Sequence, residues 1–277
     1  MNLSRAILIT GATDGLGLAL AERLAVDGAD LILHGRNQAK LARIADQFAA
    51  RGASRPRTVT ADLADLDQVR RMAAEIRASV SRLDVLVNNA GIGGGQPDGR
   101  TRRTSADGHE LRFAVNYLAG FLLTLELLPL LRASAPARIV NVASIGQHPL
   151  DFENLMLEHD YDGTRAYGQS KLAQITSGFE LAARLPADEV TVNSLHPATY
   201  MPTKIVLAEI GHSIDTLDQG VTATHRLATD PALADTTGRF YDRTRDTRAH
   251  SQAYDGEARL RLWQASLELT KAESPLC

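Results

Sequence analysis

The amino-acid sequence predicts a single-domain α/β fold, a doubly wound parallel sheet with helices on both faces. Short apolar segments alternate with longer amphipathic segments about six times. The apolar segments are continuous runs, as expected of strands that helices cover on both faces. A glycine-rich turn directly follows the first of them, residues 6–10, and leads into a helical segment. These three features together favour parallel strands joined by crossover helices.

The elements are expected in the order strand, helix, strand along the chain. Strands are expected at residues 6–10, 30–34, 58–60, 83–88, 138–143 and 190–195. Apolar residues that recur every three or four positions indicate two long helices, at about 107–131 and about 166–185. Irregular structure is expected at 91–99, at 147–164 and in the tail after Gly238, and none of these looks like a domain boundary. Residues 1–277 are therefore expected to form one domain, with a substrate loop at about 199–220 and a C-terminal extension at about 238–277.

The composition narrows the class of function. The chain has 277 residues, 44% of them hydrophobic, and a formal net charge of −3, which argues against nucleic acid as the main partner. The only cysteine, Cys277, is the last residue, and the eight histidines show no metal-ligand spacing, so neither a disulfide nor a metal site is expected. No run approaches the roughly 18 to 20 apolar residues of a membrane span. We expect a soluble, cytoplasmic protein that acts on a small molecule.

The turn after the first strand has the composition of a phosphate-binding loop. Residues 10–17 read Thr-Gly-Ala-Thr-Asp-Gly-Leu-Gly. Small residues at a strand-to-helix turn let the backbone approach a pyrophosphate, and the helix N-terminus supplies free amides. The spacing is not the Gly-x-Gly-x-x-Gly of the usual dinucleotide fingerprint, and a turn that needs glycine only for its geometry is the alternative. The candidate cofactor-binding residues here are Gly11, Thr13, Asp14, Gly15, Leu16 and Gly17.

The second strand ends in Gly35, Arg36 and Asn37, about twenty residues beyond the glycines, where an acidic residue would bind the ribose 2′-hydroxyl of NAD. No acid is present. Gly35 leaves room and Arg36 can meet a 2′-phosphate, so NADP(H) is favoured and NAD(H) stays possible. Arg36 could instead be a solvated surface arginine. The third strand leads into Asp62 and Leu63, a candidate adenine contact, although Asp62 could equally cap the next helix.

Polar residues follow the fourth and fifth strands, at the sheet edge where open α/β sheets bind ligands. The fourth strand leads into Asn89, Ala90 and Gly91, which are candidate cofactor contacts. Ser144 follows the fifth strand and could donate to a carbonyl oxygen or cap the strand. Asn116 interrupts the apolar stripe of the first long helix, so it must find partners if it is buried, or else it is a tolerated surface residue.

Tyr167 and Lys171 are four residues apart at the head of the second long helix, which places both side chains on one face. A cation stabilises phenolate, so the pair could exchange protons near neutral pH although free tyrosine has a pKa of ~10. Tyr161 and Arg165 have the same spacing, but Asp162 and the glycine after it favour a turn. Tyr161 is expected to line the substrate loop.

Taken together, these segments resemble the classical short-chain dehydrogenase/reductase family over essentially the whole chain. The resemblance rests on residues 10–17, 88–91, Asn116, Ser144 and 167–171, which match the family's motifs in order. It implies a Rossmann-like sheet of seven parallel strands. It also implies a catalytic tetrad of Asn116, Ser144, Tyr167 and Lys171, of which Tyr167 and Lys171 also bind the cofactor.

The same resemblance implies an activity. Hydride would pass between NADP(H) and a carbonyl or alcohol group of a hydrophobic small molecule, with Tyr167 as general acid/base and Lys171 lowering the tyrosine pKa. The alternatives are an NAD-dependent alcohol dehydrogenase with the same site and a non-catalytic NADP(H)-binding regulatory protein. The family's dimers and tetramers imply a homodimer or homotetramer, with dimer contacts through the two long helices.

A finer resemblance is to the retinol-dehydrogenase-like and carbonyl-reductase-like branch. Ser144 and Tyr167 are 23 residues apart, which is long for the family. Residues 151–155, 238–241 and 262–263 also resemble that branch. The branch indicates the chemistry and leaves the substrate open.

Two segments depart from the family pattern. Asp14 stands where many NADP-using relatives carry Arg or Lys. Residues 196–203 replace the family's Pro-Gly and shift the next threonine by one position, so Thr199 and Thr203 are both candidates for the nicotinamide carboxamide, and the backbone from Pro197 to Thr199 is a further contact. Residues 200–220 are expected to form a mobile apolar lid or only to cover the core. Five basic residues are expected on a solvated, mobile surface, although they could instead meet an acidic group of a substrate: Arg239, Arg243, Arg245, Arg248 and His250.

Overall fold

The computed structural model describes residues 4–95 and 99–274. Within these residues eight strands form one sheet, in the order β3-β2-β1-β4-β5-β6-β7-β8. Strands β1 to β7 run parallel, and β8 pairs antiparallel with β7. The expected doubly wound sheet of seven parallel strands is confirmed, and β8 adds an antiparallel edge. The strands are β1 (Ala6–Ile9), β2 (Asp30–Gly35), β3 (Arg57–Thr60), β4 (Val85–Asn88), β5 (Ala137–Val142), β6 (Val190–His196), β7 (Arg239–Asp242) and β8 (Arg245–Thr247).

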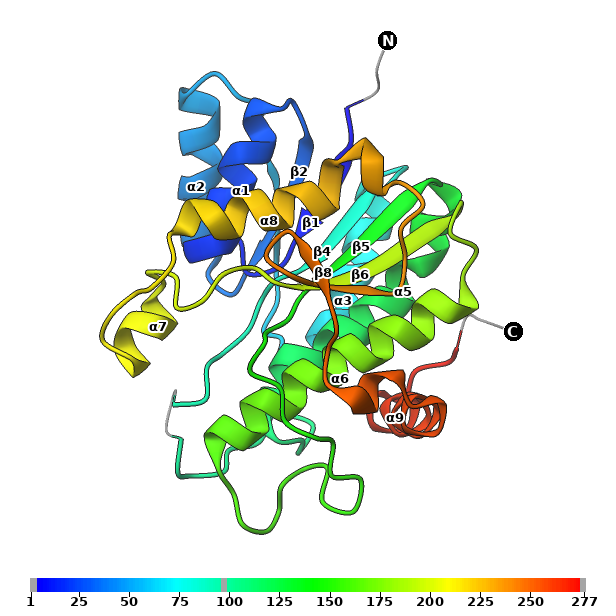
Figure 1. Ribbon diagram of the computed structural model, residues 1–277. Coiled ribbons are helices and arrows are strands. Elements are labelled where there is room, and N and C mark those ends of the chain that lie inside the picture. Colours follow the sequence, from blue (N-terminus) through cyan, green and yellow to red (C-terminus); the bar gives the residue numbers. More distant parts are fainter. Residues whose placement is uncertain (1–3, 96–98, 275–277) are drawn as a thin grey trace.

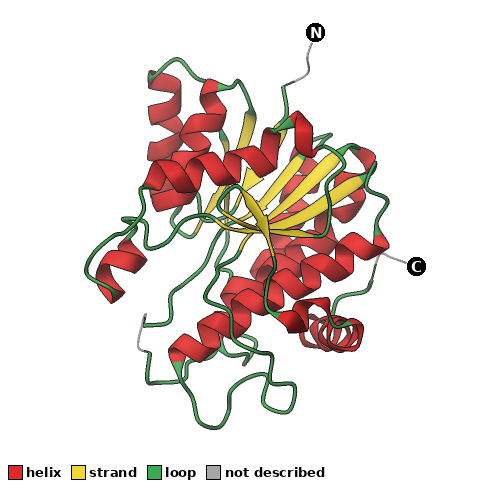
Figure 2. Ribbon diagram, in the orientation of Figure 1, coloured by secondary structure: helices red, strands yellow, loops and turns green. Residues whose placement is uncertain are grey.

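Helices cover both faces of the sheet, as Figures 1 and 2 show. Residues of α1, α2 and α8 form one apolar core with the sheet, and residues of α3, α5, α6 and α9 belong to the core on the other face. The helices are α1 (Gly15–Val26), α2 (Gln38–Ala50), α3 (Leu66–Ser79), α4 (Leu111–Phe113), α5 (Ala119–Ala133), α6 (Gly163–Arg184), α7 (Lys204–Glu209), α8 (Leu217–Thr229) and α9 (Gly256–Thr270). Short 3₁₀ turns lie at Pro231–Leu233 and Ser251–Tyr254.

Strand β1 shows why the strands are apolar without interruption. Ile7 and Ile9 face the core with α1 and α8, whereas Leu8 faces the core with α3 and α5. All three side chains are fully buried. A strand in this position must be apolar on both faces, because successive side chains point to opposite sides of a sheet.

The first long helix begins four residues later than expected. The side chain of Glu110 accepts a hydrogen bond from the Phe113 amide at 2.7 Å and so starts α4 at Leu111. A π-helical turn, Ala114–Leu118, separates α4 from α5. The helix expected at about 166–185 spans Gly163–Arg184, because Asp162 caps it by accepting from the Arg165 amide.

The continuous helical segment Leu111–Ala133 is long and apolar enough to cross a membrane, which corrects the expectation that no segment approaches such a span. Its 18-residue apolar window is 72% buried inside the protein. Packing in the core therefore accounts for the apolar character of this segment.

The tail after Gly238 is ordered, contrary to expectation. It contains β7, β8 and α9, and α9 packs against α6 (Figure 1). Leu262 and Trp263 of α9 are fully buried. The tail lacks a strong apolar period because only one narrow stripe of α9 is covered. Cys277 lies outside the described residues.

Candidate active site

The loop after β1 leaves the N-terminus of α1 accessible to a ligand. Gly11 and Gly15 have φ angles of +67° and +49°, in the region that favours glycine. A Cβ atom on Gly17 would overlap the Gly11 carbonyl oxygen and lie 2.6 Å from Asn89 Nδ2. Leu16 is buried in the core and anchors the first turn of α1. The predicted phosphate-binding loop thus has the closely approachable backbone that a pyrophosphate needs, and the amides that follow Gly15 in the first turn of α1 are available to it.

Asp14 is neutralised by two lysines. Its side chain caps α1 by accepting from the Gly15 amide at 2.9 Å, and it pairs with Lys40 of α2 at 3.3 Å and with Lys204 of α7. These contacts, Lys204 first, lower the pKa of Asp14. The carboxylate that stands in place of the family's Arg or Lys therefore brings two cations to the same loop. The sequence analysis missed both lysines.

The end of β2 presents Arg36 to solvent. The space beside Gly35 is filled by Thr13, because a Cβ atom on Gly35 would overlap the Thr13 methyl group. The Asn37 side chain caps α2 by accepting from the Lys40 amide at 2.9 Å. Of the residues predicted at this strand end, Arg36 has the exposed guanidinium that a 2′-phosphate would meet.

At the end of β3, Asp62 accepts from the Ala64 amide at 3.0 Å, and Leu63 is buried. The cap of α3 is Asp65, which accepts from the Gln68 amide at 3.1 Å. Asp62 therefore shapes the turn before the helix and does not cap it.

His34 is a structural residue of the site that the sequence analysis missed. Its Nδ1 accepts from the Gly11 amide at 3.2 Å, and its Nε2 lies 3.1 Å from the Ala61 carbonyl oxygen. Burial lowers the pKa of His34, so the neutral ring accepts at one nitrogen and donates at the other. It joins the carboxyl ends of β1, β2 and β3. The position of His34 near the end of the second strand, directly before Gly35, is the sequence signal that could have identified it.

Thr10 ties the phosphate-binding loop to the loop after β4. Its hydroxyl accepts from the amides of Asn89 at 2.9 Å and Ala90 at 3.0 Å, and Asn89 Nδ2 donates to the Thr10 carbonyl at 2.8 Å. The predicted contacts Asn89 and Ala90 are thus fixed against the glycine loop. The Asn89 side chain is engaged with the Thr10 carbonyl, and the backbone of Gly91, the next residue after Ala90, lies near Lys171.

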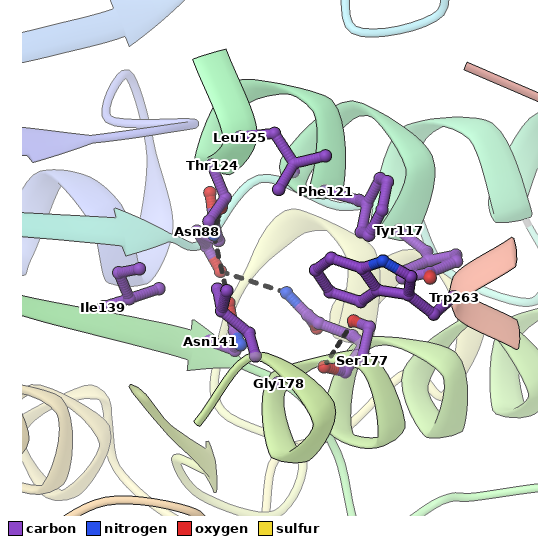
Figure 3. A pocket seen from close by; sticks show the side chains of 13 residues that line it. Asn88, Tyr117, Phe121, Thr124, Leu125, Ile139, Asn141, Ser177, Gly178 and Trp263 are labelled. Carbon is purple, nitrogen blue, oxygen red and sulfur yellow. Dashed lines mark hydrogen bonds between the residues drawn. The ribbon is translucent and has the colours of Figure 1, made fainter. Parts of the chain in front are cut away.

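Asn88 points away from this site into a pocket between α5 and α6 (Figure 3). Its Nδ2 donates to Thr124 at 3.1 Å and to Asn141 at 3.0 Å. Trp263 of α9 lines the same pocket. This pocket lies between α5, α6 and α9, and Asn88 and Asn141 enter it from the ends of β4 and β5.

Asn116 lies in the π-helical turn and is buried. Its Oδ1 accepts from the Ile92 amide at 2.8 Å, and its Nδ2 donates to the Ile92 carbonyl at 3.1 Å and to Ser170 Oγ at 3.0 Å. Asn116 therefore joins the loop after β4 to α6, which confirms the polar interpretation over the surface one. Single π-helical turns are frequent at functional sites.

Tyr167 and Lys171 lie on one face of α6, with Lys171 Nζ 5.8 Å from the centroid of the Tyr167 ring. Lys171 Nζ donates to the Val142 carbonyl at 2.8 Å. A Cβ atom on Gly91 would lie 3.6 Å from the same Nζ. The predicted tetrad and the loop after β4 therefore meet at the carboxyl end of the sheet.

The pKa of Tyr167 is raised, which corrects the expectation that Lys171 lowers it. Burial has the largest effect, because it removes water from the phenolate. A hydrogen bond to the Ser144 hydroxyl acts in the opposite direction, and the charge of Glu209 raises the pKa further. Burial also lowers the pKa of Lys171 to about 8.

The residues after β6 form a hydrogen-bond network with Arg243, which the sequence analysis placed on a mobile surface. The Thr199 hydroxyl contacts His196 Nε2 at 3.1 Å and accepts from the Arg243 guanidinium at 3.2 Å. The Thr199 amide donates to Asp215 at 2.6 Å, and Arg243 pairs with the same carboxylate. The side chain of Arg243 is therefore held in place, because the turn between β7 and β8 positions it beside the segment that follows β6.

Tyr200 in this segment has a φ angle of +45°, in the left-handed region. The Thr203 methyl group lies 3.2 Å from the position of a Cβ on Gly15. Of the two threonine candidates, Thr203 lies at the glycine loop, whereas the Thr199 hydroxyl is engaged with His196. Residues 197–199 directly follow β6, so their backbone lies at the carboxyl end of that strand.

Arg112 is a second residue that the sequence analysis missed. Its fully buried guanidinium donates to the carbonyls of Gly93 at 2.8 Å and Gly94 at 2.7 Å. It also contacts Tyr161, whose hydroxyl donates to Glu110 at 3.0 Å. Tyr161 lies outside α6, as predicted, and supports the loop after β4 through Arg112.

Comparison with known proteins identifies the family. The model of the short chain dehydrogenase family matches residues 5–209. The chain belongs to this family. Within the short-chain dehydrogenases it is 33% identical over 98% of its length to human retinol dehydrogenase 13, of which 86% is covered. A protein of Streptomyces sp. (strain C5), provisionally assigned as the daunorubicin C-13 ketoreductase DnrU, is 34% identical over 95% of this chain and 91% of its own length.

A solved short-chain dehydrogenase fold resembles this one closely. The NADP active-site complex of RhlG from Pseudomonas aeruginosa has a TM-score of 0.69 and 26% identity, over 87% of this chain and 95% of that one. These similarities confirm the retinol-dehydrogenase-like branch of the short-chain dehydrogenases and their Rossmann-type fold. Among the residues that the structure describes, no group of three His, Cys, Asp or Glu side chains could hold a metal ion.

Proposed function

We propose that this short-chain dehydrogenase is an NADP(H)-dependent oxidoreductase that interconverts a carbonyl and an alcohol group of an apolar small molecule. The observation that carries the proposal is the meeting of Ser144, Tyr167 and Lys171 at the carboxyl end of the sheet, beside Gly91. This edge is where open α/β sheets bind their ligands.

The residues present fit a bound NADP(H). The first turn of α1 offers free amides to a pyrophosphate, and exposed Arg36 offers a guanidinium to a 2′-phosphate. The NADP complex of RhlG supports the same cofactor for this chain. When bound, the nicotinamide supplies or accepts the hydride.

The side chains supply the proton chemistry. The Tyr167 hydroxyl donates a proton to the substrate oxygen during reduction, and the Ser144 hydroxyl donates a hydrogen bond to the same oxygen. The ammonium of Lys171 binds the cofactor ribose and stabilises phenolate after the proton has left. Asn116 holds the Ile92 backbone and α6 in register beside Lys171.

The Tyr167 hydroxyl is protonated at neutral pH, because burial raises its pKa above the ordinary value. Reduction of a carbonyl consumes that proton. Together with the exposed Arg36, this supports an NADP(H)-dependent carbonyl reductase ahead of an NAD-dependent alcohol dehydrogenase with the same site.

The substrate class is proposed from the lid and from the relatives. In the lid segment, residues 200–220, Met201 is buried in the core. Three other apolar side chains of the lid are exposed: Ile205, Leu207 and Ile210. The lid therefore presents apolar surface beyond what covers the core. The names of the two relatives refer to retinol and to a ketone of daunorubicin, and both support an apolar carbonyl or alcohol.

The test is the rate of NADPH oxidation with a panel of apolar ketones. Tyr167→Phe should lower kcat by roughly 10²- to 10⁴-fold, because it removes the general acid and keeps the ring. NADPH binding, measured by fluorescence, should be retained. The matched control is Tyr254→Phe, a partly exposed tyrosine on the 3₁₀ turn before α9. Near wild-type turnover by Tyr167→Phe would show that the role of Tyr167 is wrong.

Cofactor choice and the non-catalytic alternative are tested separately. Arg36→Ala should weaken NADPH binding and leave NADH binding nearly unchanged, whereas Arg55→Ala, a surface arginine paired with Asp46, should alter neither. Tight NADPH binding with no turnover of any ketone would favour a regulatory protein. The cytoplasmic location stays a prediction, which fractionation of cells that express the full chain would measure.

A further inference from the structure

The loop after β5, residues 143–150, folds back on Ser144. The Gly146 amide donates to Ser144 Oγ at 3.0 Å, and the Gln147 amide donates to the Ile145 carbonyl at 2.9 Å. The Gln147 side chain donates from Nε2 to the Ser144 carbonyl at 2.9 Å. One bond therefore holds the hydroxyl oxygen of Ser144 and another holds its main chain. Because Oγ accepts in the first bond, the hydroxyl proton can be donated to a substrate oxygen.

The same loop lies against the general acid. A Cβ atom on Gly146 would lie 3.4 Å from Ser144 Oγ and 4.0 Å from Tyr167 Cε1. On α6, a Cβ atom on Gly168 would lie 2.9 Å from His148 Cβ and 3.1 Å from the His148 amide nitrogen. The loop thus packs on α6 directly beside Tyr167. A displacement of this loop would move Ser144 relative to Tyr167.

Side-chain hydrogen bonds fasten the loop to the C-terminal part of the chain. Gln147 Oε1 accepts from the His250 amide at 2.7 Å. The Gln252 side chain accepts from the Leu150 amide at 2.7 Å and donates to the Leu150 carbonyl at 3.1 Å. His250 Nδ1 in turn accepts from the Gln252 amide at 3.2 Å. Gln147 is therefore bonded at one end to Ser144 and at the other end to the start of the 3₁₀ turn Ser251–Tyr254.

This 3₁₀ turn is itself anchored on α6. Ala253 is fully buried in the core to which α6 contributes. The ring of Tyr254 packs on Phe179 of α6, with centroids 5.2 Å apart. The helix that carries Tyr167 thus also carries the point to which Gln147 is fastened.

We propose that Gln147 is a positioning residue for the reaction, which transmits the anchorage of the 3₁₀ turn to Ser144 and so fixes the Ser144 hydroxyl beside Tyr167. Glutamine suits this role because its side chain offers a donor to the Ser144 carbonyl and an acceptor to the His250 amide. A misplacement of about 1 Å at a reacting centre can cost about 10² in rate. This inference rests on the proposed function, because Ser144 acts in the same site.

The test is a double-mutant cycle on kcat, with NADPH, the full chain and a ketone that the wild-type enzyme reduces. Gln147→Met nearly keeps the size of the side chain and removes both hydrogen bonds. It should lower kcat by about tenfold and leave NADPH affinity unchanged. In a Ser144→Ala background the same substitution should cause no further loss, because its effect passes through Ser144.

The matched control is Gln252→Met, which removes the two hydrogen bonds to Leu150 and leaves those of Gln147 in place. It should lower the melting temperature as much as Gln147→Met does and keep kcat within about twofold of the wild-type value. Gln147→Ala repeats the cycle with a smaller side chain, so a folding defect in Gln147→Met leaves the test in place.

Two results would overturn the inference and leave the proposed function intact. One is wild-type kcat in both Gln147 variants, and the other is a double variant whose kcat falls well below that of Ser144→Ala. Wild-type kcat in Ser144→Ala, or a wild-type enzyme that reduces no ketone, would overturn both the inference and the proposed function.

Discussion

The indole ring of Trp263 packs edge-on against the ring of Phe121, with centroids 5.1 Å apart and planes inclined by 77°. The Arg184 guanidinium lies over the same indole at 4.8 Å from the ring centroid. Three helices, α5, α6 and α9, thus meet at one aromatic residue that is 1% exposed. The C-terminal helix is therefore part of the core.

Trp263→Ala should lower the free energy of unfolding by about 3–5 kcal/mol, because it leaves a cavity among α5, α6 and α9. The matched control is Leu260→Ala on the same helix, whose side chain is 51% exposed and should change stability by less than about 0.5 kcal/mol. Denaturant unfolding measures both. Equal losses for the two variants would show that α9 does not pack as described.

The position of α9 also bears on oligomeric state. The implied dimer would use α5 and α6, and α9 packs on α6 and contacts Phe121 of α5. A partner subunit would have to displace these contacts. We therefore predict a monomer of 29.9 kDa, measured by light scattering on the full chain. A mass of twice that value would contradict the monomer and support the dimer expected from the family.

His196 should make stability depend on pH. Burial lowers the pKa of His196 to about 4, below its ordinary value of 6.5. Between these values the unfolded chain binds a proton that the folded chain does not bind. The free energy of unfolding should therefore fall as the pH drops from 6.5 to 4, by up to ~1.4 kcal/mol per pH unit, and His196 should contribute no further loss below pH 4.

The measurement for this prediction is denaturant unfolding across that pH range. His196→Asn should flatten the slope, although buried His34, whose pKa is also lowered, will keep part of it. His159→Asn, at an exposed loop position, should keep the wild-type slope. An unchanged slope in His196→Asn would assign the pH dependence to other groups.

Gly17→Ala should damage the cofactor loop, because the added Cβ would overlap the Gly11 carbonyl oxygen and crowd Asn89. We expect a loss of about 1–3 kcal/mol in stability and weaker NADPH binding. Gly256→Ala is the matched control, since its nearest contact is the flexible Arg259 guanidinium at 4.0 Å. Thermal unfolding and NADPH titration measure both variants, and wild-type NADPH affinity in Gly17→Ala would contradict the close approach.

The sheet and the motif residues were predictable because their signals are local. The apolar run of β1 and the glycines that follow it are adjacent in sequence, and so are Tyr167 and Lys171 on one helical face. The start of α4 was missed because the Glu110 cap is a single side-chain contact that interrupts no apolar pattern. The role of Arg243 was missed because its partner, Asp215, is 28 residues away.

The sequence by itself determined the class of fold and the family, and it supplied the four residues proposed as the tetrad, because these depend on local residue patterns and on the order of the motifs along the chain. The tertiary structure decided what surrounds the tetrad. It raised the pKa of Tyr167 by burial, paired Asp14 with two lysines, and seated Glu209 on the loop after β4. Burial and charge at a site depend on side chains that distant segments bring together, and no spacing along the chain encodes their distances.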